Sequence, residues 1–357
     1  MRVVIDGTPL TVPTGGVARY TAELSRALAG CFPEDEFRLV SDQPFPMPAQ
    51  AANLKQGSRP GRWFERRWWS CGLPRELMRS RADVFHGTDF SVPYIPVRPS
   101  VMTLHDLSPW LDPSWHRDAA RVRQRTPILL RLRLATMVVT PSESVRRAAI
   151  ERFRILPDRI VSIPLAAAET FRPVGGRAAE VPYFLYVGTL EPRKNIPLLI
   201  EAWREVRRRC PVDLVLAGRR RADFPMPASE PGLRVLRAVP DEELPALYSG
   251  AVAVLYPSFY EGFGLPVLEA MQCGAPVLAS RDAAIAEVAG GAALLLPVDE
   301  AWPWVEAMEK LLRQPERTEE MRGRGLARAQ GFRWAKTARA TREVYFEAVA
   351  RFRRRFL

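Results

Sequence analysis

Two glutamates bracket a glycine-rich loop in the stretch YEGFGLPVLEA. Glu261 follows a predicted strand, and Glu269 lies about one turn into the helix that we expect next. Gly262 and Gly264 permit a sharp turn and offer N–H groups, while Pro266 suits the first turn of a helix, where its missing N–H costs nothing. Carboxylates accept hydrogen bonds well from vicinal sugar hydroxyls. The pair can therefore hold a sugar-containing ligand, although Glu269 alone also fits a helix surface.

A cationic pair lies in the upstream stretch GTLEPRKN. Gly188 ends a predicted strand, and Arg193 and Lys194 come just before a helix expected to begin near Asn195. Two cations at the positive end of a helix dipole suit a diphosphate. The alternative is a solvated basic turn, since exposed arginine and lysine are common.

Two weaker signals follow strands nearer the N-terminus. Gly15 and Gly16 open a helix, and paired glycines let the backbone approach a ligand without a Cβ. The loop is neither GxGxxG nor a Walker loop, so a tight helix N-cap is the alternative. His105 follows the strand in SVMTLHD, where a lone histidine is often only a capped or core residue.

Strand-length apolar runs alternate with helical stretches along the whole chain. One series runs from RVVID to IVSIP, and a second from YFLYVG to AALLLP. This alternation predicts an α/β fold with two doubly wound, Rossmann-like parallel sheets covered on both faces. Ligands bind such sheets outside the carboxyl ends of the strands. The motifs described above all fall at that edge.

Bulk properties narrow the class of protein without identifying a partner. A length of 357 residues suits two domains. No apolar run is long enough to span a bilayer, and the start, MRVVIDGTPL, reads as a strand rather than a signal peptide. Four cysteines without CxxC spacing argue against a zinc site or a disulfide framework and fit a reducing cytoplasm. The net charge of +12 attracts anions, but a GC-rich genome explains the arginine content equally well.

Taken together, EGFGLPVLEA, GTLEPRKN and MQCGAPVLAS resemble the retaining glycosyltransferases of family 4. The resemblance is strongest over residues 183–297 and continues through GGVARYTAEL, DVFHGTDF, TLHDL and VVTPSESVRR. It implies the GT-B fold, in which two Rossmann-like domains face each other across a cleft. We expect an acceptor-side domain at 1–175, a nucleotide-sugar-binding domain at 176–333, and a C-terminal helix at 334–357 that crosses back. Turn residues near 174–181 mark the boundary.

The resemblance implies a role for each motif residue. Glu261 matches the glutamate beside the transferred sugar, and Glu269 matches the one that binds the ribose hydroxyls. Arg193 and Lys194 match the pair that holds the diphosphate and stabilises the leaving group. His105 matches the histidine near the anomeric carbon. These residues imply attack by an acceptor hydroxyl on the face that the nucleotide leaves, with retention and with electrostatic stabilisation of the diphosphate.

Backbone groups complete the site that the resemblance implies. Gly15 and Gly16 match a loop that approaches the phosphates. The other implied donor-binding positions are Gly188, Gly262, Phe263, Gly264, Leu265 and Val239. Many family members carry arginine after the glycine that matches Gly188, but this chain has Thr189, so the diphosphate depends more on the downstream basic pair. The chain contains no DxD pair, which fits cations of the protein in place of a metal; we expect no metal and no cofactor.

Similarity to one subgroup of the family suggests a donor and an acceptor. IDGTPLTVPTGGVARY, TLHDL and GTLEPRKN are similar to bacterial mannosyltransferases of O-antigen and exopolysaccharide assembly. This favours GDP-mannose as donor and a lipid-linked or polysaccharide acceptor. UDP-glucose and related UDP-sugars are the alternative, because base selection depends on backbone contacts near Val239 and Pro240.

Three readings from other classes fit less well. A nucleotide-binding oxidoreductase lacks its GxGxxG motif. A nucleic-acid-binding protein is suggested by charge alone, without a binding module. A catalytically inactive homologue conflicts with the retained glutamates and basic pair.

Arginine and tryptophan interleave in RPGRWFERRWWSCGLPRELMRSR, residues 59–81, a combination that favours an anionic lipid–water interface. A second basic stretch, HRDAARVRQRTPILLRLRLA, has apolar residues on a helical period. We expect a cytoplasmic enzyme with peripheral contact at the inner face of the plasma membrane. The alternative is that the aromatic residues pack in the core and the arginines are merely solvated.

Overall fold

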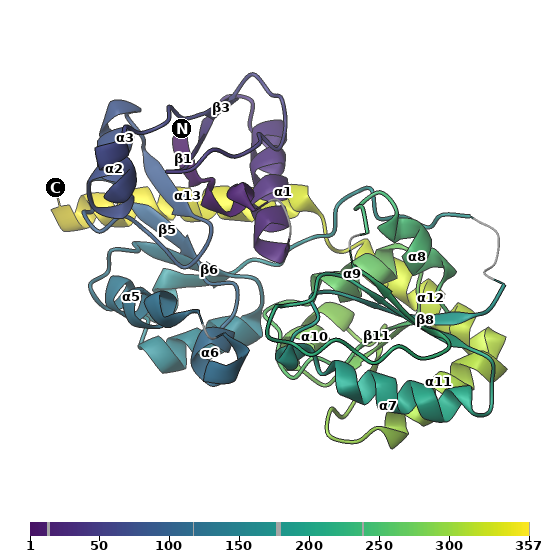
Figure 1. Cartoon of the computed structure of the whole chain (residues 1–357). Coiled ribbons are helices and arrows are strands. Elements are labelled where there is room, and N and C mark those ends of the chain that lie inside the picture. Colours follow the sequence, from purple (N-terminus) through teal and green to yellow (C-terminus); the bar gives the residue numbers. More distant parts are fainter. Residues whose placement is uncertain (13–14, 117, 176–179, 238, 357) are drawn as a thin grey trace. The chain divides into compact units, whose positions relative to one another are not determined.

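The computed structural model forms two compact units (Figure 1). The described residues are 1–12, 15–116, 118–175, 180–237 and 239–356. Unit 1 comprises Met1–Leu111, His116–Leu165 and Arg333–Leu357, and unit 2 comprises Asp112–Trp115 and Ala166–Phe332. The boundary predicted from turn residues near 174–181 falls partly on residues 176–179, which lie outside the described ranges, so the division at 175 and 176 stays a prediction.

In the described part of unit 1, seven parallel strands form one sheet in the order β3-β2-β1-β4-β5-β6-β7. The strands are β1 (Arg2–Asp6), β2 (Glu36–Val40), β3 (Leu54–Gln56), β4 (Val84–Gly87), β5 (Ser100–Thr103), β6 (Met137–Thr140) and β7 (Ile160–Ser162). The central strands β4, β5 and β6 are buried along their whole length, as expected for a parallel sheet covered on both faces. The sequence pattern does not indicate β3, a short strand at the edge.

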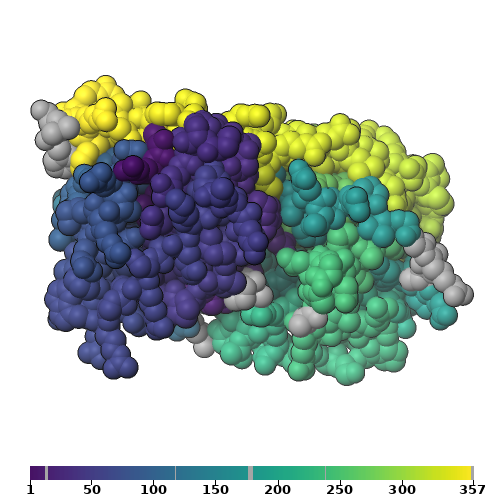
Figure 2. Space-filling view, turned by 90° about the horizontal axis from the view of Figure 1, so that it is seen from above, coloured from purple at the N-terminus to yellow at the C-terminus, as the bar shows by residue number. Residues whose placement is uncertain are grey.

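Helices cover both faces of this sheet (Figure 1). They are α1 (Gly16–Cys31), α2 (Arg62–Arg66), α3 (Leu73–Arg79), α4 (Ser108–Leu111), α5 (Ala120–Arg131), α6 (Glu143–Phe153) and α13 (Trp334–Phe356), with the short turns η1 (Thr8–Thr11), η2 (Trp68–Gly72) and η4 (Pro157–Arg159). The C-terminal helix α13 packs on α1 and on β4, β5 and β6, and Figure 2 shows it in yellow at the surface. Tyr345 of α13 is fully buried, with its hydroxyl oxygen 2.8 Å from Nδ1 of His86 on β4.

The described part of unit 2 holds a parallel sheet of six strands in the order β10-β9-β8-β11-β12-β13. Its strands are β8 (Tyr183–Val187), β9 (Asp213–Ala217), β10 (Leu233–Leu236), β11 (Ala253–Tyr256), β12 (Val277–Ser280) and β13 (Leu294–Leu296). Its helices are α7 (Ile196–Arg207), α8 (Leu244–Gly250), α9 (Leu265–Gln272), α10 (Ala283–Ala289), α11 (Trp302–Arg313) and α12 (Pro315–Ala329), with the short turns η3 (Pro113–Trp115) and η5 (Pro192–Lys194). The two doubly wound parallel sheets predicted from the sequence are confirmed.

Each sheet reverses its strand order at one point. In unit 1 the reversal lies between β1 and β4, and in unit 2 it lies between β8 and β11. The loops that follow two such strands run in opposite directions and leave a crevice at the carboxyl edge, where ligands of open α/β sheets bind. Topology therefore indicates one potential site in each unit.

Among the described residues, no helix has the length and apolar character that crossing a bilayer requires.

Candidate active site

The basic pair lies in the loop that follows β8. Arg193 and Lys194 end the turn η5, and Asn195 adopts a left-handed conformation, with φ of 51°, between this turn and α7. The side chains of the pair are directed into unit 2, because Arg193 is only 8% exposed and Lys194 only 7%. The alternative of a solvated basic turn is therefore wrong.

The same two cations form ion pairs with Glu261, which follows β11. Lys194 Nζ lies 2.5 Å from Glu261 Oε1, and Arg193 Nη1 lies 3.2 Å from Oε2. Arg193 Nη1 also donates to the carbonyl oxygen of Tyr260 at 2.7 Å, and its Nη2 donates to Glu191 Oε1 at 2.9 Å. The loops after β8 and β11 are thereby joined by charge-assisted hydrogen bonds at the point where the strand order reverses.

The charges of the pair control the ionisation of Glu261. Burial alone would raise the pKa of this carboxyl, but the positive charges of Lys194 and Arg193 and the hydrogen bond from Lys194 outweigh it and lower the pKa to about 2. Burial and the neighbouring Arg193 lower the pKa of Lys194, against the opposing effect of Glu261. At neutral pH Glu261 is therefore a fixed anion rather than a proton donor.

Three further residues support the ion pair and are not among the predicted site residues. Glu191 orients Arg193, and Tyr256 accepts from Lys194 Nζ through its hydroxyl at 2.9 Å. Asp282 accepts from the backbone N–H of Glu261 at 3.3 Å and also caps α10. Glu191 lies in the GTLEPRKN stretch and Tyr256 ends a predicted strand, so their positions beside the motifs could have identified both as site residues. The role of Asp282 could not be predicted in this way, because it depends on the packing of α10 beside the loop.

Glu269 lies on α9 and is 1% exposed. Its Oε2 accepts a hydrogen bond from the Tyr248 hydroxyl of α8 at 3.0 Å. Because Glu269 is buried, the helix-surface alternative is wrong. A buried carboxylate of this kind requires polar partners, and Tyr248 is one of them. The proposed contact of Glu269 with ribose stays a prediction.

The backbone between the two glutamates bends as the glycines predict. Gly264 has φ of 96° and forms the N-cap of α9, a conformation that glycine adopts without strain. Gly262 and Phe263 lie in the loop before it, with the Phe263 ring 6.0 Å from that of Phe332, and Leu265 begins α9. Gly188 follows β8 directly, whereas Val239 lies between β10 and α8. Their contacts with a donor stay predictions.

The other predicted site residues belong to unit 1. Gly15 is the N-cap of α1, with φ of 104°, and Gly16 is the first residue of that helix. His105 follows β5, and its Nε2–H donates to the carbonyl oxygen of Thr88 at 2.7 Å, which leaves Nδ1 as the acceptor. The His105 ring also meets the Tyr20 ring edge-on, with centroids 4.8 Å apart. Burial lowers the pKa of His105, so the ring is neutral at pH 7.

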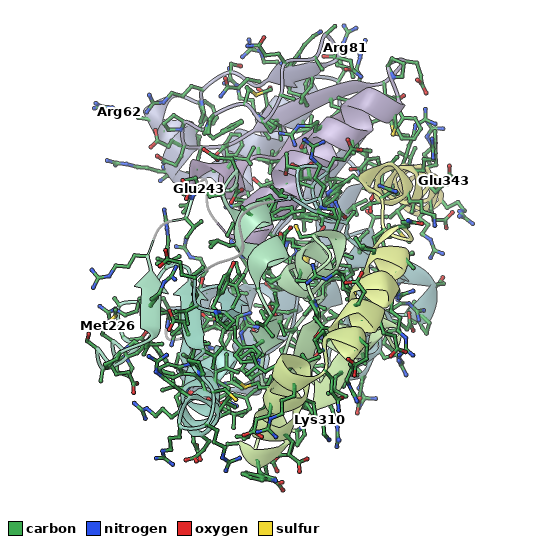
Figure 3. All side chains as sticks on the ribbon, turned by 90° about the vertical axis from the view of Figure 1, so that its right-hand side faces the viewer. Arg62, Arg81, Met226, Glu243, Lys310 and Glu343 are labelled. Carbon is green, nitrogen blue, oxygen red and sulfur yellow. The ribbon has the colours of Figure 1, made fainter. Side chains whose placement is uncertain are left out.

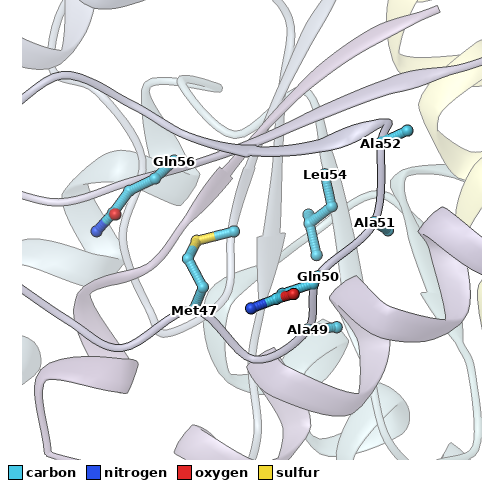
Figure 4. Close-up of a pocket in the computed structure, with 7 residues that line it drawn as sticks. All are labelled: Met47, Ala49, Gln50, Ala51, Ala52, Leu54 and Gln56. Atoms are coloured by element: carbon cyan, nitrogen blue, oxygen red, sulfur yellow. The ribbon is translucent and has the colours of Figure 1, made fainter.

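Two hollows in unit 1 differ in the residues that line them. A hollow of about 590 Å³ beside the edge strand β3 has no charged side chain (Figure 4). Its lining residues are Met47, Ala49, Gln50, Ala51, Ala52, Leu54 and Gln56. A second cavity, of about 470 Å³, borders Gly15 and Gly16, and its lining includes Asp6, Asp89 and Arg125. Within the described ranges no group of three or more His, Cys, Asp or Glu side chains is arranged to hold a metal ion.

Both halves of the chain match known families. Residues 14–167 match the family described as "Glycosyltransferase Family 4", and residues 167–328 match "Glycosyl transferases group 1". The chain is 33% identical to the O-antigen chain mannosyltransferase B of Escherichia coli, over 97% of this chain and 99% of that protein. It is 29% identical to the serotype-specific mannosyltransferase WbdA of Escherichia coli, over 67% of this chain and 32% of that protein. A sucrose-phosphate synthase structure from Thermosynechococcus elongatus superposes with a TM-score of 0.78 at 19% identity, over 98% of this chain and 99% of that one.

Proposed function

Because this chain belongs to glycosyltransferase family 4, a family of retaining enzymes with the GT-B fold, we propose that it transfers mannose from GDP-mannose. The acceptor is a lipid-linked or polysaccharide glycan in cell-surface glycan synthesis. The likeness to an O-antigen chain mannosyltransferase and to a serotype-specific mannosyltransferase supports this choice of sugar and pathway. A UDP-sugar such as UDP-glucose is the alternative donor, because the base is selected by backbone contacts near Val239, and side-chain types there do not distinguish guanine from uracil.

The paired cations carry the proposal. Arg193 and Lys194 are buried, fixed by Glu261 and placed at the reversal point of the unit 2 sheet. A donor diphosphate there meets two positive charges that are already oriented, which is the arrangement that stabilises a leaving group without reorganisation. The N-terminal amides of α9 add a partial positive charge for the same anion. The protein's own cations thus take the place of a divalent metal.

The remaining residues then have defined tasks. Glu261, held ionised, lies beside the transferred sugar and stabilises positive charge that develops at the anomeric carbon. Glu269 accepts hydrogen bonds from the ribose hydroxyls. His105, neutral and with Nδ1 as acceptor, lies near the anomeric carbon, and Gly15 and Gly16 approach the phosphates. The acceptor hydroxyl attacks the face from which the diphosphate departs, so the configuration is retained.

A nucleotide screen tests the donor site. Melting temperatures are measured without metal in the presence of GDP, UDP, ADP or NAD, because a ligand that binds the folded state stabilises it by mass action. We expect GDP alone to raise the melting temperature, with the shift lost in Glu269→Ala and Lys194→Ala. Lys310→Ala serves as the control, since Lys310 is an exposed lysine of the same unit. A shift with UDP alone would replace GDP-mannose, and a response only to NAD would contradict the whole assignment.

Unit 1 also supports peripheral contact with an anionic membrane. Trp63 on α2 is 55% exposed, with the Arg67 guanidinium 4.8 Å from its ring centroid. Arg62 and Arg66 flank it and are exposed, and the labelled Arg62 side chain projects outward in Figure 3. Trp68, by contrast, is 4% exposed, so the aromatic residues of this stretch divide between the core and the surface. Exposed arginine and tryptophan on one short helix suit the headgroup region, and this supports the proposed contact with the cytoplasmic face of the plasma membrane.

Vesicle binding tests this contact. We expect the protein to sediment with phosphatidylglycerol vesicles at low salt and to be released by salt, because screening weakens surface charge attraction. Trp63→Ala should weaken binding, whereas Trp302→Ala, at an equally exposed tryptophan of unit 2, should not. Equal binding of both variants, or none by the unmodified protein, would contradict the proposal.

A further inference from the structure

Four buried side chains of unit 1 form one continuous chain of hydrogen bonds. The Tyr345 hydroxyl oxygen lies 2.8 Å from Nδ1 of His86, and Nε2 of His86 lies 2.8 Å from Oγ1 of Thr103. The same Thr103 oxygen lies 3.0 Å from the hydroxyl oxygen of Tyr20. None of these residues is more than 1% exposed. We call this set the polar chain, and its members are Tyr345, His86, Thr103 and Tyr20.

The polar chain joins elements that are far apart in the sequence. Its members lie on α13, β4, β5 and α1. Burial, with repulsion from His105 as a second cause, lowers the pKa of His86 to about 3, so this ring is neutral. A neutral imidazole donates from one nitrogen and accepts at the other, and both nitrogens of His86 are bonded in this way. The ring therefore cannot turn without breaking two hydrogen bonds, and α13 holds the rest of the polar chain in one arrangement.

The polar chain ends beside His105, the histidine that we propose to lie near the anomeric carbon. The rings of Tyr20 and His105 meet edge-on, with centroids 4.8 Å apart and planes at 84°. The Nε2–H of His105 donates to the carbonyl oxygen of Thr88 at 2.7 Å. A hydrogen bond at one nitrogen still allows an imidazole ring to pivot about it. Close packing against the Tyr20 ring, which its own hydroxyl anchors, restricts that motion.

Thr103 also acts on the surroundings of His105 through its backbone. Its carbonyl oxygen accepts from the N–H of Phe90 at 3.1 Å, and the carbonyl oxygen of Phe90 accepts from the Thr126 hydroxyl at 3.0 Å. These bonds hold Phe90 at φ of 47°, a left-handed conformation that is unfavourable for a bulky residue. The Phe90 ring thereby lies 6.2 Å from the His105 ring. Backbone strain maintained by its surroundings is concentrated at functional sites.

Stability alone does not require a polar chain at this place. Buried polar groups cost free energy unless each is paired, and apolar groups of the same shape can replace both partners of a hydrogen bond at little cost. A fully satisfied network has a different effect, because it fixes one arrangement of side chains. The contact between this network and a neutral histidine at the edge of the sheet therefore indicates a role in orientation.

We propose that the polar chain positions the His105 ring for glycosyl transfer, so that the C-terminal helix α13 sets the geometry of a residue in the site. The proposal rests on the proposed function, which gives His105 its place beside the anomeric carbon. The members of the polar chain act through His105 and are positioning residues for the reaction.

Nitrogen-15 NMR of the histidine rings in the full chain tests the position of His105 without substrate. The chain contains three histidines, so single glutamine variants assign their signals. We expect one Nε2–H tautomer for His105 in the unmodified protein, and shifted or broadened His105 signals in Thr103→Val and Tyr345→Phe. Thr103→Ser keeps the hydroxyl and should retain the original signals. Tyr94→Phe, at an exposed tyrosine of the same unit, is the matched control. Unchanged His105 signals in both test variants would overturn the proposal.

Kinetic coupling to His105 distinguishes positioning from a general loss of packing. Release of GDP from GDP-mannose is measured with methyl α-D-mannopyranoside as the acceptor probe. Tyr345→Phe should lower kcat about fivefold and Thr103→Val about tenfold, with KM for GDP-mannose unchanged, because a misplaced ring affects the reacting geometry rather than donor binding. In the His105→Ala background, neither substitution should lower kcat by more than about twofold.

The outcomes separate this inference from the proposed function. Equal losses of kcat with and without His105 would overturn the proposal, since a general packing defect acts independently of that ring. A GDP-induced melting shift that persists in Tyr345→Phe and Thr103→Val shows that these variants are folded and that the donor site is intact. Failure of the unmodified protein to bind GDP would instead contradict the donor proposal, and the NMR comparison would still decide whether the polar chain orients His105.

Discussion

The two sheets share one topology but carry opposite electrostatics at their reversal points. Between β8 and β11, Glu261 is held by Arg193 and Lys194, and its pKa falls to about 2. Between β1 and β4, Asp6 is hydrogen-bonded by Thr8, which is uncharged, and its pKa rises to about 7. Both carboxyls are buried, so the difference comes from their neighbours rather than from depth.

This contrast shows that one topology can set the ionisation of a buried carboxyl in opposite directions. Unit 2 fixes charge in advance, which suits an anionic leaving group. In unit 1, burial raises the pKa of Asp6 to about 7 and that of Asp89 to about 6, so both carboxyls change protonation near neutral pH. The strand order decides where each site lies, and the residues of the loops decide what it can bind.

Removal of Lys194, which forms an ion pair with Glu261, should have the largest effect on activity. Lys194→Ala should reduce kcat for mannosyl transfer about 10³-fold, because one preoriented charge on the leaving group is lost. A radiolabelled GDP-mannose transfer assay measures the loss, with Lys310→Ala as control. A loss confined to KM would mean that Lys194 binds the donor equally in the ground state and the transition state.

Breaking the ion pair from its anionic side should destabilise unit 2. Glu261→Gln leaves two buried cations without their shared partner and should lower the free energy of unfolding by about 3 kcal/mol. Urea denaturation measures the change, and Glu300→Gln, at an exposed glutamate of the same unit, is the control. In a double-mutant cycle, Lys194→Met should lower the free energy of unfolding less in the Glu261→Gln variant than in the unmodified protein. Additive losses would show that the pair does not interact.

The same pair fixes a pH dependence at the acid end. Because the folded pKa of Glu261 lies below its unfolded value, the stabilisation is complete above about pH 4.5 and is lost as pH falls toward about 2. Glu261→Gln should therefore flatten the decline of stability below pH 4.5. Denaturation series in citrate buffers check this window.

Asp6 should show the opposite pH dependence. Its pKa is about 7 in the folded state and close to 3.8 when unfolded, so the folded state binds the proton more tightly. Stability is therefore complete below about pH 3.8 and falls as pH rises through about 7. Asp6→Asn should remove this loss, so that its free energy of unfolding relative to that of the unmodified protein rises by about 3 kcal/mol from pH 5 to pH 8. An unchanged pH profile would show that Asp6 is ionised throughout.

The smallest effect is expected at the buried support of Glu269. Tyr248→Phe removes the hydroxyl that donates to Glu269 Oε2 and should weaken GDP binding about fivefold, the equivalent of one ordinary hydrogen bond. Isothermal titration with GDP measures it. Tyr94→Phe, at an exposed tyrosine of unit 1, should leave GDP affinity unchanged.

Local pattern was sufficient for most elements and for the identity of the charged residues. The RVVID run coincides with β1, and Pro266 and Gly274 mark the two ends of α9, the latter with φ of 72°. The edge strand β3 is only three residues long and has too short an apolar pattern to predict a strand. Its backbone hydrogen bonds with β2 make it a strand, and they depend on the tertiary structure.

The sequence by itself determined the α/β class, the family, and the presence of two glutamates and a basic pair in loops at strand ends. Only the tertiary structure decided that Glu261 bonds both cations, that Glu269 is buried against Tyr248, and that Asp6 and Asp89 share a cavity. The physical reason is range. Helix and strand periodicity is a property of neighbouring residues, whereas burial and charge pairing depend on residues that the strand order brings together from distant parts of the chain.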